Sequence, residues 1–314
     1  MNTIPLSQPL HHKSMNPDSS HHVPVMADEV TRLVAETGPR VIVDGTCGAG
    51  GHAEALLSRI PGIERYFCID WDAHALKIAE HRLAAHGSVV EFIRTNFATI
   101  PDLLSAYGIG CVDVVILDLG LSSMHLDSSG RGFSFLKDEP LDMRMDDTEP
   151  YTALDLIRET PEAQLALLIR EFGQERWAKP IARAIKYYCE QGAAPTSKGL
   201  GEVIKRAIPR RFHPRKIHPA TRTFQALRIA LNRELDNLKT ALERFPSILC
   251  AGGRFLVISF HSLEDRLVKH SFRDDPRLEV VTRRPLMPGD YEKAMNPRSR
   301  SAKLRCAQRG EVRE

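Results

Sequence analysis

A glycine-rich turn carries the clearest chemical signal in the sequence. The segment DGTCGAGGHA (44–53) follows an apolar run and opens a helical stretch, and Gly48, Gly50 and Ala53 have the G-x-G-x-x-A spacing of a dinucleotide-binding turn. Glycines let the backbone turn tightly and approach a ligand where a Cβ atom would collide. The turn therefore predicts binding of a nucleotide-like cofactor.

Acidic and aromatic residues stand at the ends of four predicted strands. Asp44, Asp70 and Asp118 end the first, second and fourth strands, and Phe97 follows the third. A carboxylate at Asp70 can accept hydrogen bonds from both hydroxyls of a ribose, and Phe97 and Asp118 stand where they can border an adenine. Helix capping is the simpler role for Asp44 and Asp70. Because open α/β sheets bind ligands at the carboxyl ends of their strands, the four residues together favour a binding site.

The position of Asp44 separates two cofactor classes. A pyrophosphate, as in NAD, prefers bare amides at a helix N-terminus, and a carboxylate beside it would repel it. Asp44 stands directly before the glycines, where an anion suits a cationic amino group or a sulfonium. The sequence therefore favours S-adenosylmethionine over NAD.

Alternating apolar and helical runs predict the sheet that would position these residues. Continuous apolar strands separated by helices indicate a mostly parallel, doubly wound α/β sheet covered on both faces. The predicted strands are 41–45, 65–70, 89–95, 112–120 and 252–260, and the first helices are 52–60 and 72–85. About 130 residues separate the fourth strand from the fifth, against a dozen or more for an ordinary crossover. Helical periodicity over 151–190 and 221–244 predicts that a helical unit is inserted there.

Composition and cysteine spacing exclude several classes of protein. An apolar fraction of 42% is typical of a globular chain with a core, and no apolar run approaches the ~20 residues of a membrane helix. The six cysteines are scattered without a CxxC pair, which argues against a disulfide scaffold and a cysteine zinc site and fits a reducing cytoplasm. We expect no metal site. Cys47, Cys68 and Cys111 are interpreted as small buried residues rather than as thiolate nucleophiles.

Local charge points to a phosphate-binding face despite a net charge of only +3. Residues 205–216 and 298–309 are basic runs without an acid. One such run is usually a solvated surface, but two in one half of the chain favour contact with nucleic acid. The candidate phosphate contacts are Arg144, Arg210, Arg211, Arg215, Arg222, Arg298 and Arg300. Phe133 and Phe135 could stack on bases or anchor their loop.

His261 follows the fifth predicted strand and is a candidate for the reaction site. It could contact a base or carry a proton, and a hydrogen-bonded structural role is equally open. Glu264 and Asp265 begin a predicted helix and are interpreted as partners of its dipole.

Long motifs resemble the bacterial RsmH (MraW) family of S-adenosylmethionine-dependent N4-cytosine methyltransferases of 16S ribosomal RNA. The resemblance runs from residue 22 to near the C-terminus. The matching stretches are HVPVMADEV (22–30), DGTCGAGGHA (44–53), LDLGLSS (117–123), RGFSF (131–135), PLDMRMD (140–146), ERWAKPIARAI (175–185), HPATRTFQALRIALNREL (218–235), GGRFLVISFHSLEDRLVK (252–269) and NPRSRSAKLR (296–305).

The resemblance implies a class I, Rossmann-like methyltransferase fold with a helical domain inserted after the fourth strand. It implies methyl transfer to the exocyclic N4 amine of a decoding-centre cytidine in the small ribosomal subunit. The cofactor contacts of the family map onto Gly50, Gly51, His52, Asp70, Phe97, Asp118 and position 125. The family usually has Gln at that last position, whereas this chain has His125, which lacks the paired donor and acceptor of an amide.

Asp118 and the turn after it are expected to lie at the methyl donor. Asp118 would orient the cofactor or the amine, and Ser122 is a weaker candidate. A strong general base is not needed, because the amine nitrogen becomes acidic only after it has received the methyl group. Reaching the base requires an unpaired or extruded nucleotide.

We expect three segments and leave two other functions open. Residues 1–22 are expected to form a disordered tail, 23–125 and 232–314 the catalytic domain, and 126–231 the inserted RNA-recognition domain.

A methyltransferase of another amine acceptor is one alternative function, although the (D/N/S)PP(Y/F) motif of DNA amino-methyltransferases is replaced here by DLGL. A non-catalytic, RNA-binding assembly factor is the other. The sequence leaves the oligomeric state open, including a homodimer.

Overall fold

The computed structural model describes residues 24–121, 129–191 and 194–311. The predicted tail over 1–22 and two candidate site residues, Ser122 and His125, lie outside the described residues.

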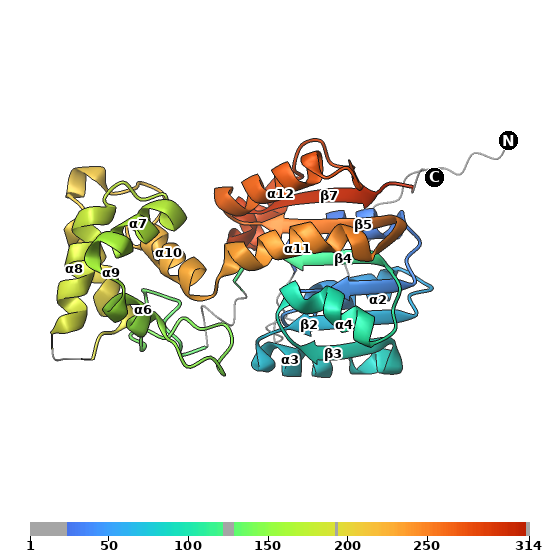
Figure 1. Cartoon of the computed structure of the whole chain (residues 1–314), viewed down its shortest axis with the longest axis horizontal. Coiled ribbons are helices and arrows are strands. Elements are labelled where there is room, and N and C mark those ends of the chain that lie inside the picture. Colours follow the sequence, from blue (N-terminus) through green and yellow to red (C-terminus); the bar gives the residue numbers. More distant parts are fainter. Residues whose placement is uncertain (1–23, 122–128, 192–193, 312–314) are drawn as a thin grey trace.

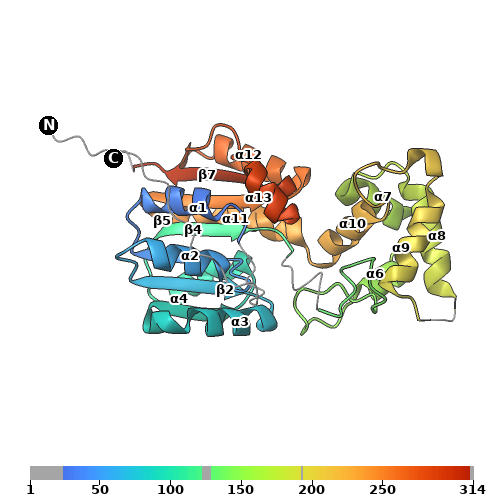
Figure 2. The same ribbon diagram turned by 180° about the vertical axis from the view of Figure 1, so that it is seen from behind.

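A twisted sheet forms the centre of the larger domain (Figures 1 and 2). Its strand order is β3-β2-β1-β4-β5-β7-β6, with parallel pairing from β3 to β5, and β7 runs antiparallel to both β5 and β6. The strands are β1 (Val41–Asp44), β2 (Arg65–Asp70), β3 (Val90–Arg94), β4 (Val112–Asp118), β5 (Leu249–Ser259), β6 (Leu278–Val280) and β7 (Lys303–Arg309). The mostly parallel, doubly wound sheet expected from the apolar runs is confirmed.

Helices cover both faces of this sheet, so its strands are buried on two sides. One face packs against α1 (Ala27–Ala35), α2 (Gly51–Arg59) and α3 (Ala73–Leu83). The other packs against α4 (Ile100–Ala106), α11 (Glu234–Ile248) and α12 (Ser262–Asp274). The shorter elements of this domain are η1 (Ala84–Val89), η2 (Phe97–Thr99), α13 (Asp290–Met295) and η4 (Pro297–Ser301).

A helical unit stands beside the sheet, between β4 and α11 in the chain (Figure 1). It contains α6 (Ala153–Glu159), α7 (Glu162–Gly173), α8 (Ala178–Glu190), α9 (Ser197–Ala207), η3 (Arg210–Phe212) and α10 (Thr221–Leu231). These helices share a hydrophobic core of their own, to which Ile157, Ile169 and Leu227 belong, each with no exposed surface. We call residues 129–231 the insert.

The apolar stripe over 221–244 spans two helices rather than one. Helix α10 ends at Leu231, and Arg233, at φ 51°, has a left-handed conformation before α11 begins at Glu234. The side-chain amide of Asn232 donates to the carbonyl oxygens of Arg228 (3.0 Å) and Met143 (2.9 Å) and so closes the end of α10. The stripe continues through this break because both helices bury the same kind of face.

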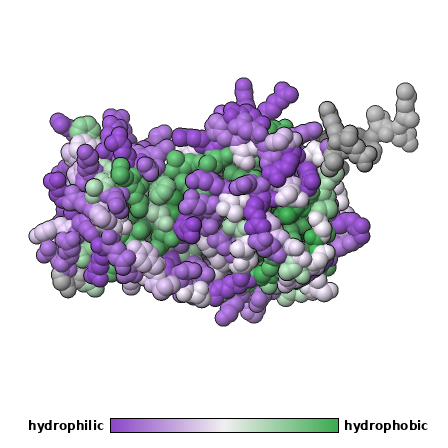
Figure 3. Space-filling view, viewed as in Figure 1, coloured by the Kyte–Doolittle hydropathy of each residue, from purple (hydrophilic) through white to green (hydrophobic). Residues whose placement is uncertain are grey.

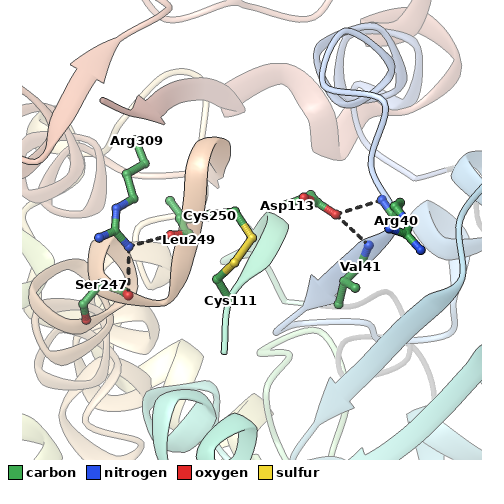
Figure 4. Close-up of a disulfide and its surroundings, with 8 residues drawn as sticks. All are labelled: Arg40, Val41, Cys111, Asp113, Ser247, Leu249, Cys250 and Arg309. Carbon is green, nitrogen blue, oxygen red and sulfur yellow. Dashed lines mark hydrogen bonds between the residues drawn. A yellow bond between two sulfur atoms is a disulfide. The ribbon is translucent and has the colours of Figure 1, made fainter. Parts of the chain in front are cut away.

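A disulfide joins Cys111 to Cys250, so the expectation of scattered reduced cysteines is wrong for this pair (Figure 4). Val112 pairs with Leu249 where β4 and β5 begin, and this register puts the neighbouring cysteines side by side although 139 positions separate them. Cys111 is exposed, not buried as expected. Cys47, Cys68, Cys189 and Cys306 are free and buried. The cysteines thus lend no support to a reducing compartment.

Backbone anchors hold the strands on both sides of the disulfide (Figure 4). The Asp113 carboxylate accepts hydrogen bonds from the amides of Arg40 (2.8 Å) and Val41 (2.9 Å). The Arg309 guanidinium donates to the carbonyl oxygens of Ser247 and Leu249. In the described part of the chain, no helix is both long and apolar enough to cross a bilayer.

Candidate cofactor and substrate site

A cavity of about 490 Å³ opens at the carboxyl ends of β1, β2 and β4, within the size range of small-molecule sites. Six residues predicted to bind the cofactor line it, namely Gly48, Gly51, His52, Asp70, Phe97 and Asp118. Asp44, Gly50 and His261 do not line it, although the neighbours of His261, Phe260 and Glu264, do. The parallel sheet therefore brings most of the predicted residues to one cavity.

The glycine turn is tied to the second strand through Asp70. The Gly48 amide donates to one oxygen of the Asp70 carboxylate (2.8 Å), and the Asp72 amide donates to the other (2.9 Å). Gly48 and Gly50 have φ values of 54° and 77°, which favour glycine. A Cβ atom at Gly50 would lie 3.2 Å from the side chains of Ala79 and Leu83. Gly50 thus supports the turn from behind, where it packs on α3.

Asp44 lies beneath the turn rather than in the cavity wall. It is 1% exposed, and its carboxylate accepts hydrogen bonds from the Thr46 amide (3.2 Å) and the Tyr66 hydroxyl (3.3 Å). Burial raises the pKa of Asp44 to about 7, against the lowering effects of His52 and the Thr46 amide. Thr46 in turn accepts a hydrogen bond from the Asp118 amide (2.6 Å). Asp44 therefore stabilises the loop that carries the cavity wall.

Asp118 and His52 face each other with unused hydrogen-bonding capacity. Their closest atoms, Nε2 of His52 and Oδ2 of Asp118, are 3.5 Å apart. Burial lowers the pKa of His52, but the nearby carboxylates, with Asp118 foremost, outweigh it and hold this pKa above its ordinary value. Both ring nitrogens of His52 and Oδ1 of Asp118 are buried and have no hydrogen-bond partner among the described residues. Such atoms call for a polar ligand, so the cavity fits a polar cofactor such as S-adenosylmethionine.

The insert completes one wall of the cavity. Arg131 donates to the Asp72 carboxylate (2.6 Å) and to the carbonyl oxygens of Arg144 and Met145. The side-chain oxygen of Asn232 accepts a hydrogen bond from the Met145 amide (2.8 Å). Met145 itself lines the cavity. The loop that carries Met145 is therefore fixed to the sheet domain next to Asp70.

Two carboxylates line the cavity, and a histidine lies beside one of them. Glu234 and Glu264 line it, and Nε2 of His261 is 3.1 Å from the Glu264 carboxylate. One oxygen of Glu264 accepts hydrogen bonds from the amides of Phe260 and His261, which confirms the predicted role of Glu264 at the start of a helix. His261 is the N-cap of α12. In the described residues, Nε2 of His261 has no well-aligned hydrogen-bond partner.

The predicted RNA contacts divide into internal and exposed residues. Phe133 is 5% exposed, and Phe135 stacks on His218 with 4.4 Å between ring centroids, so both anchor their loop and neither presents a stacking face. Arg144 forms an ion pair with the Asp142 carboxylate (2.7 Å), so its charge is already paired inside the insert. Arg298 is half-buried and lines the cavity, and Arg222 lies 3.9 Å from Glu175. The exposed candidates are Arg210, Arg211, Arg215 and Arg300.

Phe212, which follows the exposed Arg211, is connected through Trp177 to the segment that contacts the sheet domain. Phe212 packs on Trp177, with 5.1 Å between ring centroids. Three residues before Trp177, Gln174 accepts a hydrogen bond from the Ser262 hydroxyl at the start of α12 (2.7 Å). The space-filling view also shows hydrophobic residues gathered between the two parts of the molecule (Figure 3).

Comparison with known proteins decides the family. The sequence profile described as the MraW methylase family matches residues 19–310. The chain belongs to the MraW methylase family. The ribosomal RNA small subunit methyltransferase H of Synechococcus elongatus is 46% identical over 296 residues, covering 94% of this chain and 97% of the relative. The protein of the same name from Desulfotalea psychrophila is 45% identical over 288 residues, covering 92% and 98%. An rRNA methylase structure from Streptococcus thermophilus aligns with a TM-score of 0.41 and 12% identity, covering 90% and 95%.

As a member of the MraW methylase family, the chain is an S-adenosylmethionine-dependent methyltransferase. Sequence reasoning about the site missed Glu234 and Thr46. Glu234 lies inside an apolar stripe that looks like one continuous helix. Asn232 is the residue that could have indicated the break before Glu234, since Asn is favoured at the end of a helix. Thr46 is part of the glycine turn, but nothing in its spacing reveals the bond to the Asp118 amide.

Proposed function

We propose that this chain transfers a methyl group from S-adenosylmethionine to the exocyclic N4 amine of a decoding-centre cytidine in 16S rRNA, with the 30S subunit or a precursor as its partner. The cavity supports this proposal, because its lining contains both the predicted cofactor residues and the carboxylates of Glu234 and Glu264.

The residues around the cavity suit a cationic methyl donor. When bound, S-adenosylmethionine supplies an electrophilic methyl group on a positively charged sulfur. Asp70 would hold the ribose hydroxyls, Phe97 would border the adenine, and the turn at Gly48 and Gly51 would leave room for the chain of the cofactor. Asp118 and His52 would orient the donor or the acceptor through the atoms that have no partner among the described side chains. These assignments are proposals, as are those of Ser122 and His125.

The cytosine amine is a weak nucleophile, because its lone pair is shared with the ring. The protein therefore contributes mainly by holding the amine in line with the methyl group and by excluding water. Met145 and Glu264 both line the cavity that would hold the base. A flipped base is required, since a paired or stacked amine could not reach the cavity.

Methyl transfer to defined substrates tests the proposal. We expect the chain to transfer label from S-adenosylmethionine to 30S particles from a strain that lacks the gene, and not to already methylated 30S particles or to DNA. Nucleoside mass spectrometry should identify the product as N4-methylcytidine, which should be missing from rRNA of the deletion strain. Unchanged N4-methylcytidine in that strain would contradict the proposal. Tight RNA binding without methyl transfer would favour the assembly factor instead.

A further inference from the structure

Glu234 stands at the junction between the insert and the sheet domain. It is the first residue of α11, directly after left-handed Arg233. Its carboxylate receives two hydrogen bonds from Arg228 of α10, Nε to Oε1 at 2.7 Å and Nη2 to Oε2 at 2.8 Å. The side chains of Arg228 and Glu234 are only 13% and 10% exposed. A carboxylate is thus held in a fixed position across the junction, where it lines the cavity.

Glu234 belongs to a cluster of ionisable side chains, two of which line the cavity. Single ligand-type atoms of Glu234, His261 and Glu264 all lie within 4.8 Å of one another. Glu264 is fixed by the two backbone amides described above, and His261 by the Glu264 amide, which donates to its Nδ1 (3.4 Å). Glu234 and Glu264 therefore present rigidly held hydrogen-bond acceptors to a molecule in the cavity.

We propose that Glu234 is a catalytic residue that accepts a hydrogen bond from the target amine and takes up the proton released by methyl transfer, with Arg228 as its positioning residue. The inference rests on the proposed function. An exocyclic amine offers N–H donors, and a carboxylate is a suitable acceptor for the N4 amine of cytosine. Each carboxylate oxygen keeps a lone pair after it has accepted from Arg228, so an additional donor can be bound.

The proton balance of the reaction agrees with this role. A bond forms between the amine nitrogen and the methyl carbon, and the carbon–sulfur bond breaks with its electron pair remaining on sulfur. The nitrogen then carries one proton too many, which moves to the Glu234 carboxylate and from there to water. Burial raises the pKa of Glu234 against the lowering effect of Arg228, which makes this carboxylate a better proton acceptor than an exposed one.

A metal ion is the competing occupant of the same cluster. Both oxygens of Glu234 already contact a guanidinium, and this positive charge disfavours a second cation beside it. A neutral N–H donor meets no such repulsion. The geometry therefore favours an amine over a metal.

Substitution of Glu234 by glutamine tests the role without a change of shape. We expect Glu234→Gln to lower kcat on 30S particles about 10- to 100-fold, the loss typical of one hydrogen bond to a charged group, while KM and the Kd of S-adenosylmethionine stay within about twofold. The acid side of the kcat–pH profile should also flatten, because the carboxylate that takes up the proton is removed. Arg228, Glu264 and His261, the charged groups that face Glu234, remain unchanged in this variant. Glu243→Gln, exposed on the same helix, is the matched control and should behave as wild type.

A double variant separates the catalytic role from a structural one. If Glu234 acted only as the partner of Arg228, removing both charges with Glu234→Gln and Arg228→Met would restore activity, since no buried charge would be left unpaired. We expect the double variant to stay as slow as Glu234→Gln, with S-adenosylmethionine affinity and melting temperature retained. Recovery of the double variant, an unchanged rate in Glu234→Gln, or a loss of wild-type activity in EDTA that Mg²⁺ or Mn²⁺ restores would overturn the inference. Inactive wild-type protein on 30S particles would contradict the proposed function instead.

Discussion

The amide of Gly48 donates a hydrogen bond to the carboxylate of Asp70 over 2.8 Å. The two residues end up together because β1 and β2 are parallel neighbours, with Asp44 paired to Cys68 near their carboxyl ends. The cofactor turn and the predicted ribose-binding acid are therefore one unit. A change at either residue should be felt at the other.

Asp70→Asn should weaken binding of S-adenosylmethionine about 10- to 100-fold. The amide side chain keeps the shape of the carboxylate but gives up one charged acceptor, which is worth about 1.5–3 kcal/mol. Isothermal titration calorimetry measures the effect. Asp236→Asn, on the exposed face of α11, serves as the control. Equal affinities in Asp70→Asn and wild type would exclude the proposed ribose contact.

Asp44 should make the unliganded protein less stable as the pH rises. Its pKa is about 7 in the folded chain against an ordinary value of 3.8, so between these values the folded state binds more protons than the unfolded state, and the free energy of unfolding falls with pH. The shift corresponds to about 4 kcal/mol at most. Urea unfolding of wild type and Asp44→Asn at pH 4 to 8 should give a flatter dependence in the variant. Parallel curves would show that Asp44 is not the group responsible.

The exposed arginines between α9 and α10 should contribute to RNA affinity through phosphates. Replacing Arg210, Arg211 and Arg215 by Ala should weaken binding to 16S rRNA and reduce the slope of log K against log salt by about one per lost contact. The control replaces Arg40, Arg59 and Arg273, which are exposed on the sheet domain. A salt slope that stays the same in the first variant and falls in the control would place the RNA on the other face.

Loss of the Cys111–Cys250 bond should lower stability without changing cofactor binding. The bond closes a loop of 139 positions, and bonds of this kind typically contribute about 2–5 kcal/mol. The bond lies where β4 and β5 begin, whereas the cavity lies where β4 ends. Denaturant unfolding of Cys111→Ser/Cys250→Ser should match that of reduced wild type. An effect of dithiothreitol on the variant as well would show that the reductant acts elsewhere.

Local pattern was sufficient to predict the sheet and most of the cavity wall. Apolar runs such as VDVVILD mark strands because both faces of the sheet are covered, and polar residues at their ends then share one edge. The predicted turn at Gly48 and Gly50 depends only on backbone conformation, which glycine reveals directly. These features need no knowledge of distant contacts.

The features that sequence reasoning missed depend on contacts between distant segments. The bond between Cys111 and Cys250 follows from the register of β4 and β5, which spacing along the chain does not encode. Glu234 gains its position from a break between two helices that bury similar apolar faces. Phe133 and Phe135 were candidates for stacking on bases because their loop is polar, but both pack in or against the core of the insert.

The Cys111–Cys250 bond encloses β4, the whole insert and α11 in one covalent ring. A protease that cuts once inside this ring opens it but releases no fragment, so the nicked protein remains a single molecule until it is reduced. The helices of the insert can therefore be cut, or new chain ends introduced among them, while the strands on either side stay covalently joined.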